Sequence, residues 1–287
     1  AKVWVELGGM SQTPVFKLPN GKQARLFVDW LWKNSQEIKQ TCEGTSNHLE
    51  LIGYQAWIRG RQAYVRFSFD TDQAMGMNMV TLALKQAWQQ KISHFPQVEL
   101  VSLSGNMCTD KKTAVVNQLL GRGYQVQAEV FLSAMVLKQV LKTNVKQLLQ
   151  THVSKNLVGS NLAGSLSQNM HAANMIAAMF LATGQDAAHV VEGSQVQTTV
   201  ESENDGVYFA VNLPNLNLGT VGGGTGLPAF KQARKLILNK KEKQALTSQE
   251  LAAAVGLAVL AGEISGLAAL AGHDLAKAHQ NLARGEV

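Results

Sequence analysis

The chain has 287 residues, of which 46% are hydrophobic and 16% are charged, so it carries enough apolar material for one large or two smaller folded domains. This composition excludes collagens, coiled coils and disulfide-rich scaffolds. The formal net charge of +6 is spread along the chain: residues 20–102 hold 9 basic and 7 acidic side chains, and residues 115–287 hold 13 and 11. Because no region is strongly basic, we expect no nucleic-acid partner.

The cysteines and the first residues bear on the cellular compartment. Two cysteines, Cys42 and Cys108, are too few for a disulfide framework and suit a reducing cytosol. The chain begins without a basic leader followed by an apolar stretch, which predicts that there is no signal peptide. We therefore expect a cytoplasmic protein.

Residues 14–103 predict a compact module of their own. A short apolar run at 14–18 is followed by apolar residues at helical spacing through 26–40. Segments 49–58 and 63–69 alternate on either side of Gly60 and Arg61, as the strands of a hairpin do. A second helical pattern covers 75–92, and 98–103 closes the set as a strand. This β-α-β-β-α-β order is that of the ferredoxin-like fold.

The remainder of the chain is helix-rich. Helical patterns cover 134–152, 169–184, 227–238, 251–272 and 275–284, and two β-rich segments, 194–202 and 207–219, predict a second hairpin. We therefore predict an α+β protein in which a helix-rich large domain holds an inserted ferredoxin-like small domain. The large domain takes residues 1–19 and 115–287, the small domain residues 20–102, and a connecting loop residues 103–114.

The most apolar window, Leu251 to Gly272, is long enough to span a bilayer. It consists mostly of Ala and Gly, however, and Glu263 lies in its middle. Small residues allow other elements to approach a helix closely on all sides. A helix buried in a soluble protein or at a subunit interface is therefore favoured over a membrane span.

Two glycine-containing segments have the form of phosphate sites. Residues 219–226, "GTVGGGTG", place five glycines between a strand and a helix, so that backbone N–H groups can approach an anionic ligand. A tight turn shaped by glycine alone is the commoner explanation of such a stretch, and the dinucleotide fingerprint is absent. Residues 74–79, "AMGMNM", open a helix in the same way, although alternate Met residues are more often core packing.

Three further positions carry reactive groups. Residues 104–112, "SGNMCTDKK", form a polar connector in which a lysine beside Asp110 can donate to a developing oxyanion; an ordinary solvated loop is the alternative. Asp186 follows an apolar helix, where its charge faces the unfavourable end of the dipole; this cost suggests a compensating cation, and a solvated Asp is the alternative. His279, on the last helix, is either a mobile general acid or a surface residue. The histidines and cysteines lack metal-ligand spacing, so no metal is expected.

Taken together and in this order, the segments resemble 3-hydroxy-3-methylglutaryl-coenzyme A reductases of the eukaryotic-like class. The resemblance covers residues 9–284 and rests on "AMGMNM", "SGNMCTDKK", "KNLVGS", "HAAN", "GQDAA", "GTVGGGT" and "AGEISGLAALAGHDLAKAH". It implies reduction of a thioester to an alcohol with two NADPH, which releases coenzyme A and supplies mevalonate to isoprenoid synthesis. The family's ferredoxin-like domain, inserted in a helical one, matches the module predicted above.

The resemblance also implies roles for particular residues. Lys111 is similar to the lysine that stabilises the oxyanion, Asp186 to the aspartate that hydrogen-bonds this lysine, and His279 to the acid that protonates the departing thiolate. The residues on the substrate side are Lys17, Ser104, Asp110, Lys112, Lys155, His171 and Asn174. Those on the cofactor side are Ser46, Asn47, Gly76, Met77, Asn78, Met79, Gly222, Gly223 and Gly224. Sites between subunits imply a homodimer or a higher oligomer.

The chain also departs from the family pattern. The family's fourth catalytic group is a glutamate that precedes the point where this sequence begins, so we expect a fragment of a longer product. The alternative is an impaired paralogue that binds a coenzyme A thioester without full catalysis. Gln73 and Asn47 stand where the family has Asp and Arg. Without that arginine, the 2′-phosphate of NADPH loses a bidentate partner, so NADH is not excluded as the cofactor. Lys17 replaces an arginine, Gly285 replaces a regulatory serine, and no membrane anchor is seen.

Overall fold

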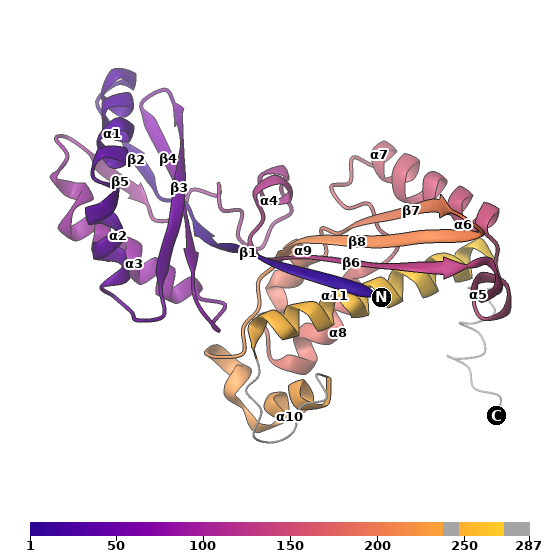
Figure 1. Cartoon of the computed structure of the whole chain (residues 1–287). Helices are drawn as coiled ribbons and strands as arrows, with labels where there is room; N and C mark the ends of the chain where they lie inside the picture. The colour runs from indigo at the N-terminus through magenta and orange to yellow at the C-terminus, as the bar shows by residue number, and fades with distance from the viewer. Residues whose placement is uncertain (238–246, 273–287) are drawn as a thin grey trace.

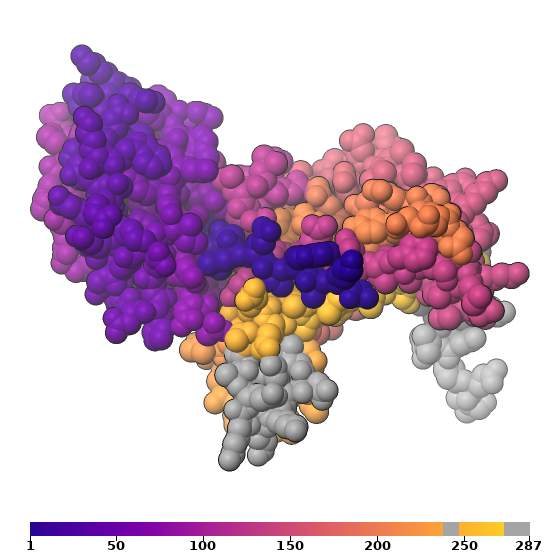
Figure 2. Space-filling view, in the orientation of Figure 1, coloured from indigo at the N-terminus to yellow at the C-terminus, as the bar shows by residue number. Residues whose placement is uncertain are grey.

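The computed structural model describes residues 1–237 and 247–272, which form two units joined by the long strand β1 (Lys2–Gln12) (Figure 1). The small unit contains β2 (Val15–Lys17), α1 (Gly21–Lys33), α2 (Ser35–Glu43), β3 (Glu50–Arg59), β4 (Gln62–Asp70), α3 (Met77–Gln90), η1 (Ile92–His94) and β5 (Glu99–Ser102). The space-filling view shows the two units as separate lobes (Figure 2).

The large unit takes the rest of the described chain. Its elements are α4 (Val115–Leu120), β6 (Gly123–Ser133), α5 (Ala134–Gln139), α6 (Val145–Thr151), the π-helix η2 (His152–Gly159), α7 (Ser160–Leu162), α8 (Ala172–Thr183), η3 (Ala187–His189), α9 (Val190–Gly193), β7 (Gln197–Glu203), β8 (Gly206–Leu216), η4 (Gly223–Gly226), α10 (Pro228–Ile237) and α11 (Ser248–Ala271).

The small unit has the strand order β5-β2-β4-β3, with every neighbouring pair antiparallel. This is the order of a ferredoxin-like sheet, so the predicted fold class, α+β with this module, is confirmed. Helices α1, α2 and α3 cover the sheet, and Phe16, Phe27 and Phe67 are fully buried between the layers. The helix predicted at 26–40 is two helices, because Asn34 leaves the helical conformation and its side chain caps the carbonyl of Trp30 at 2.8 Å.

Strand β1 is absent from the sequence prediction and connects the two sheets. Its first part, Lys2 to Gly9, pairs with β6, and its last three residues, Met10 to Gln12, pair with β4. A register shift between Leu7 and Gly9, where Gly9 has φ +78°, marks the point at which the strand changes partner. Strand β2 and the last three residues of β1 therefore lie in the same small sheet, and the domain bounds given above stay a prediction.

The large unit is built on the antiparallel sheet β1-β6-β8-β7. Helix α11 packs across β1, β6 and β8, and α8 packs against α11 below the same sheet (Figure 1). Val126, Val211, Leu251, Val255 and Val259 are buried where helix and sheet meet. Strand β6 was also missed, although its residues alternate around Gln125, Gln127 and Glu129 and two glycines, Gly121 and Gly123, precede them.

Helix α11 is long and apolar enough to cross a membrane by composition, yet half of its apolar window is buried within the chain. The carboxylate of Glu263 accepts hydrogen bonds from the amides of Met170 (2.7 Å) and His171 (2.8 Å) and from the hydroxyl of Thr198 (2.7 Å). In this structure α11 is thus a packed core helix, as the composition of the window predicted.

One other expectation for the large unit is wrong, and a second one falls on residues that the structure does not describe. The helix predicted at 134–152 is interrupted, because Lys142 takes a left-handed conformation (φ +55°) and Asn144 caps a new helix, α6, at Gln147 (3.0 Å). The short helix predicted at 275–284 lies outside the described residues.

A substitution at Gly256 would test how closely α11 packs against β6 of the large sheet. A β-carbon at this position would collide with Val126 of β6, so Gly256→Ala should destabilise the protein although alanine favours helices by about 1 kcal/mol over glycine. We expect a lower midpoint in thermal unfolding followed by circular dichroism. Ser265→Ala, at an exposed position of the same helix, is the control and should leave the midpoint unchanged; equal midpoints for all three proteins would contradict the close packing.

Candidate active site

The connecting loop between β5 and α4 is anchored to both units. The amide of Gly105 donates to the carbonyl of Thr13 in the small unit (2.6 Å). On the other side, the side chain of Gln195 bonds both the amide and the carbonyl of Ala114 (3.2 and 2.9 Å), and Asn117 Nδ2 donates to the carbonyl of Cys108 (3.1 Å). The loop is therefore held as a fixed structure in the described chain.

Three residues of this loop have left-handed backbone conformations. Asn106, Thr109 and Lys111 have φ values of +60°, +48° and +58°. A left-handed conformation typically costs a non-glycine residue about 1–3 kcal/mol. It persists only where surrounding contacts impose it. Such strain is concentrated at functional sites in proteins.

Lys111 and Asp186 form the central ion pair of the site, with Lys111 Nζ 2.9 Å from Asp186 Oδ2. Hydrogen bonding to Asp186 is the main cause that raises the pKa of Lys111. Burial favours the neutral acid of Asp186, but the Lys111 ammonium and the Ala188 amide outweigh it and hold the pKa of Asp186 below its ordinary value. Both groups therefore stay charged at neutral pH. Their side chains are 42% and 36% exposed, so a ligand can reach them.

Asp186 does not face the unfavourable end of a helix dipole, as the sequence suggested. Helix α8 ends at Gly184, which has φ +72°, and Asp186 begins the short helix η3 by accepting the amide of Ala188 at 3.0 Å. A carboxylate at a helix N-terminus is in its favourable position. The expected cation is nevertheless present, because Lys111 occupies that role.

Below this pair lies a group of buried titratable side chains that no sequence motif indicated. Arg122, His189 and Glu192 are fully buried. Arg122 Nη1 lies 2.8 Å from Glu192 Oε1 and 3.0 Å from Asp110 Oδ1. The available signal was the spacing of titratable residues 186, 189 and 192, which recur every third residue in an otherwise apolar segment.

Asp110, His189 and Glu192 bring three potential metal-ligand atoms within 4.8 Å of one another. The guanidinium of Arg122, however, lies at hydrogen-bond distance from both carboxylates. A fixed positive charge thus stands where a metal ion would have to bind. The absence of a metal stays a prediction for the chain as a whole.

The other residues predicted on the substrate side lie in four places. Lys112 Nζ donates to the Asp110 carbonyl at 3.1 Å, and the exposed Ser104 follows β5. His171 and Asn174 lie together at the start of α8, 3.4 Å apart.

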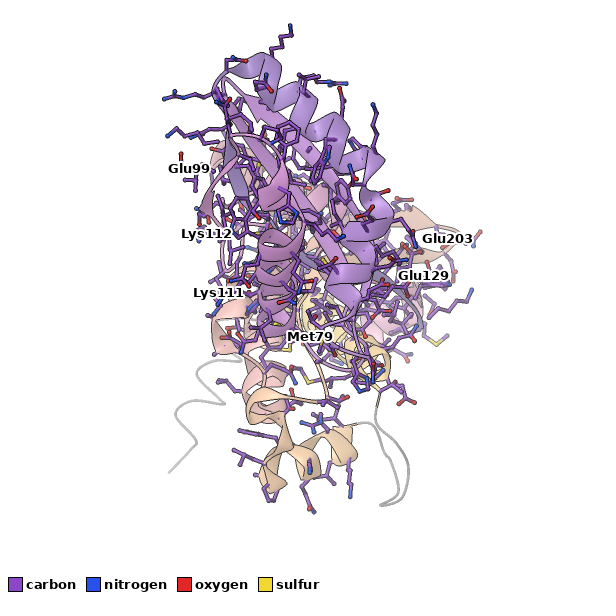
Figure 3. All side chains as sticks on the ribbon, turned by 90° about the vertical axis from the view of Figure 1, so that its left-hand side faces the viewer. Met79, Glu99, Lys111, Lys112, Glu129 and Glu203 are labelled. Carbon is purple, nitrogen blue, oxygen red and sulfur yellow. The ribbon has the colours of Figure 1, made fainter. Side chains whose placement is uncertain are left out.

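Lys17 and Lys155 lie apart from the Lys111 pair in the contacts of the described chain. Lys17 pairs with Glu99 at 3.0 Å on the β2–β5 edge, and Lys155 is exposed on η2. Glu99 lies on the same side of the molecule as Lys111 and Lys112 (Figure 3). His279 lies outside the described residues.

The two segments predicted on the cofactor side lie side by side, although about 140 residues separate them in the sequence. Ala74 and Val221 form a parallel bridge, and the carbonyl of Gln73 accepts the amides of Thr220 (2.8 Å) and Val221 (3.2 Å). The side chain of Gln73, one of the positions that depart from the family pattern, accepts the amide of Ser248 at the start of α11 (2.7 Å).

Glycine is required at the turns of both segments. Gly76, Gly222 and Gly223 have φ values of +87°, +82° and +56°, which L residues rarely adopt. A β-carbon at Gly222 or Gly223 would meet nothing within 4 Å, so open space lies beside this backbone. The arrangement fits a phosphate-bearing cofactor that lies against the glycine backbone.

Further contacts connect these segments with their surroundings. The amide of His48 donates to Ser46 Oγ (3.1 Å), and His48 Nδ1 lies 2.9 Å from Asp72 Oδ2, so residues 46–48 contact the turn before Gly76 while Asn47 stays exposed. Met77 Sδ, at the start of α3 ahead of Asn78 and Met79, lies 2.8 Å from Arg122 Nη2. The side chain of Met77 therefore connects the glycine segment at the start of α3 with the buried Arg122.

Comparison with known proteins gives a consistent result. Residues 2–284 match the family model described as hydroxymethylglutaryl-coenzyme A reductase. The chain is 43% identical over 282 residues to the 3-hydroxy-3-methylglutaryl-coenzyme A reductase of Methanocaldococcus jannaschii, with 96% of this chain and 68% of that protein covered. It is 40% identical over 287 residues to 3-hydroxy-3-methylglutaryl-coenzyme A reductase 2 of Dictyostelium discoideum, with 97% and 55% covered.

Solved structures agree on the fold. A 3-hydroxy-3-methylglutaryl-coenzyme A reductase of Streptococcus pneumoniae superposes with a TM-score of 0.69 at 18% identity, covering 93% of this chain and 73% of that one. A class II enzyme of the same organism, solved bound to NADPH, gives 0.67 at 17% identity, with the same shares covered. From these matches and the family model, the chain belongs to the hydroxymethylglutaryl-coenzyme A reductase family of oxidoreductases.

Proposed function

We propose that the protein reduces (S)-3-hydroxy-3-methylglutaryl-coenzyme A to mevalonate and coenzyme A. The balanced reaction consumes two NADPH and two protons and yields the alcohol, the free thiol and two NADP⁺. The observation that carries the proposal is the exposed ion pair of Lys111 and Asp186 on a strained, anchored loop. Family membership and the adjacent glycine segments support it.

Lys111 supplies the electrostatic part of the chemistry. Its raised pKa keeps the ammonium protonated, so it donates a hydrogen bond to the thioester oxygen, and this bond strengthens as negative charge develops there. Asp186 holds the ammonium at 2.9 Å and keeps it in one orientation. We assign to His279 the protonation of the departing thiolate.

Charged and polar neighbours suit the carboxylate and hydroxyl of the substrate. Lys112 lies next to Lys111 in the same loop, and we assign Lys17, Lys112 and Lys155 to anionic groups of the substrate because ammonium groups pair with carboxylate and phosphate. Ser104, Asp110, His171 and Asn174 complete this set as hydrogen-bonding groups.

The glycine segments would hold the nicotinamide cofactor, which supplies hydride when it is bound. Gly76, Gly222, Gly223 and Gly224 leave backbone amides accessible to its phosphates, and Met77, Asn78 and Met79 follow at the start of α3. Ser46 and Asn47 are assigned to its adenosine side. NADPH is the proposed cofactor, and no metal takes part.

We also propose an enzyme class, an oligomeric state and a cellular compartment for the protein. Identity of 40% with the Dictyostelium protein against 17% with the class II structure supports the eukaryotic-like class. A homodimer or higher oligomer, with the site between subunits, is proposed from the family resemblance. Two free, buried cysteines support the cytoplasm as its location.

The proposal is tested by mixing the chain with hydroxymethylglutaryl-coenzyme A and NADPH and following absorbance at the NADPH band together with thiol release. We expect two NADPH oxidised per thiol. Lys111→Ala should lower the rate by about 10²–10³-fold, because one donor to the oxyanion is removed, while binding of the thioester is retained.

Lys138→Ala, an exposed lysine on α5, is the matched control and should keep the rate of the parent. Equal rates for Lys111→Ala and the parent would remove Lys111 from the mechanism. Thioester binding without any NADPH oxidation by the parent would favour the impaired paralogue over the enzyme.

The ion pair also predicts a pH dependence. Asp186 is the main cause of the raised pKa of Lys111, so Asp186→Asn lowers that pKa, and the ammonium loses its proton at a lower pH. In a profile of kcat against pH, the alkaline limb should therefore move toward neutral pH. An alkaline limb that stays in place in Asp186→Asn would show that Lys111 does not control it.

Asn47→Arg should raise the preference for NADPH over NADH. A guanidinium at this exposed position offers a bidentate partner for the 2′-phosphate that asparagine lacks. The measurement is the ratio of kcat/KM with the two cofactors, and we expect about a tenfold increase, equal to roughly 1.4 kcal/mol. An unchanged ratio would place the adenosine ribose elsewhere.

A further inference from the structure

Glu192 is a fully buried carboxylate that the proposed chemistry does not use. It lies on the short helix α9, and its Oε1 atom is 2.8 Å from Arg122 Nη1, 2.9 Å from His189 Nδ1 and 3.1 Å from the backbone nitrogen of Lys111. Its Oε2 atom accepts Asn117 Nδ2 at 3.4 Å. Three donors and the ring of His189 thus surround one acid that solvent does not reach.

The surroundings keep this acid ionised. Burial favours its neutral form, but His189, Arg122 and the amide of Lys111 together hold the pKa of Glu192 below its ordinary value. Arg122 is equally buried and reaches Asp110 at 3.0 Å, the residue that precedes Lys111. The loop around Lys111 therefore rests on a fixed pair of buried charges.

Lys111 is consequently anchored twice. Its ammonium is held by Asp186 at 2.9 Å, and its backbone amide is held by Glu192 at 3.1 Å. The second contact fixes a residue whose φ of +58° is strained for a lysine. Asp186 and Glu192 lie six residues apart at the two ends of the segment formed by η3 and α9, so one small piece of structure holds both ends of the lysine.

We propose that Glu192 is a positioning residue for Lys111. It imposes the left-handed turn through the amide of Lys111, and it places Asp110 through Arg122. Its negative charge also helps to keep the Lys111 ammonium protonated. The consequence for catalysis rests on the function proposed above, whereas the effect on the lysine itself can be measured without turnover.

The first test is Glu192→Gln, which keeps the shape of the side chain and removes its charge. We expect kcat to fall by about 10–100-fold with KM changed less than about threefold, since the residue acts on the lysine and not on the substrate. Glu129→Gln is the control: this carboxylate accepts the hydroxyl of Tyr208 at 2.7 Å and lies on the opposite side of the molecule from Lys111 (Figure 3). It should behave as the parent.

The second test measures the lysine directly. Limited acetylation with acetic anhydride over a range of pH, read by tandem mass spectrometry, gives the reactivity of Lys111, with Lys138 as the internal reference. In Glu192→Gln, Lys111 should become reactive at a lower pH than in the parent, because a nearby negative charge is lost, while Lys138 is unchanged. If the single variant fails to fold, Glu192→Leu combined with Arg122→Met removes both buried charges. This variant also loses the contact with the Lys111 amide, so kcat should still fall, whereas the two charge effects on the ammonium oppose each other and the change in Lys111 reactivity should be smaller than in Glu192→Gln.

The outcomes separate the two proposals. A shifted Lys111 reactivity in a chain that does not oxidise NADPH supports the positioning role and overturns the proposed function. Full turnover by the parent, with unchanged kcat and unchanged Lys111 reactivity in the Glu192 variant, supports the function and overturns the positioning role.

Discussion

The buried guanidinium of Arg122 is the interaction on which the rest of the site depends. It contacts Glu192 and Asp110 of the candidate site, the carbonyl of Ser11 in β1 and Met77 at the start of α3. A fully buried arginine is tolerated only where its charge is paired and its donors are satisfied. Removing one partner of such a pair typically costs about 3–5 kcal/mol, so the contacts between the two units and the geometry of the loop are maintained together.

Strand β1 explains why the two units can carry one site. It belongs to both sheets and changes partner at Gly9, so the small sheet and the large sheet share a covalent and hydrogen-bonded element. The loop that carries Lys111 returns next to this strand, where Gly105 bonds Thr13. A segment between two domains would ordinarily be mobile. Here it is fixed from both sides, which allows the strained turn at Lys111 to persist.

The sequence predicted the ferredoxin-like module well, because its strands and helices are local and periodic. It missed β1 and β6, whose pairing is nonlocal and whose patterns are interrupted by glycines or polar residues. For the site, motifs led to Lys111 and Asp186, and the structure places them 2.9 Å apart. Arg122, His189 and Glu192 were missed because nothing local distinguishes a buried charge from an exposed one; only folding brings residue 122 to residue 192.

The site contains one partly exposed ion pair, Lys111 with Asp186, and one fully buried ion pair, Arg122 with Glu192. Lys111 and Asp186 are partly exposed, so water screens them until a ligand displaces it, and their interaction then strengthens as the local dielectric falls. Arg122 and Glu192 are already removed from water, so their field is the same before and after a ligand binds. A reaction that develops negative charge gains most from charges that need no rearrangement when it occurs. The buried pair meets that condition by holding the Lys111 loop in one geometry whether or not a ligand is bound, and the exposed pair is the part of the site that a ligand can reach.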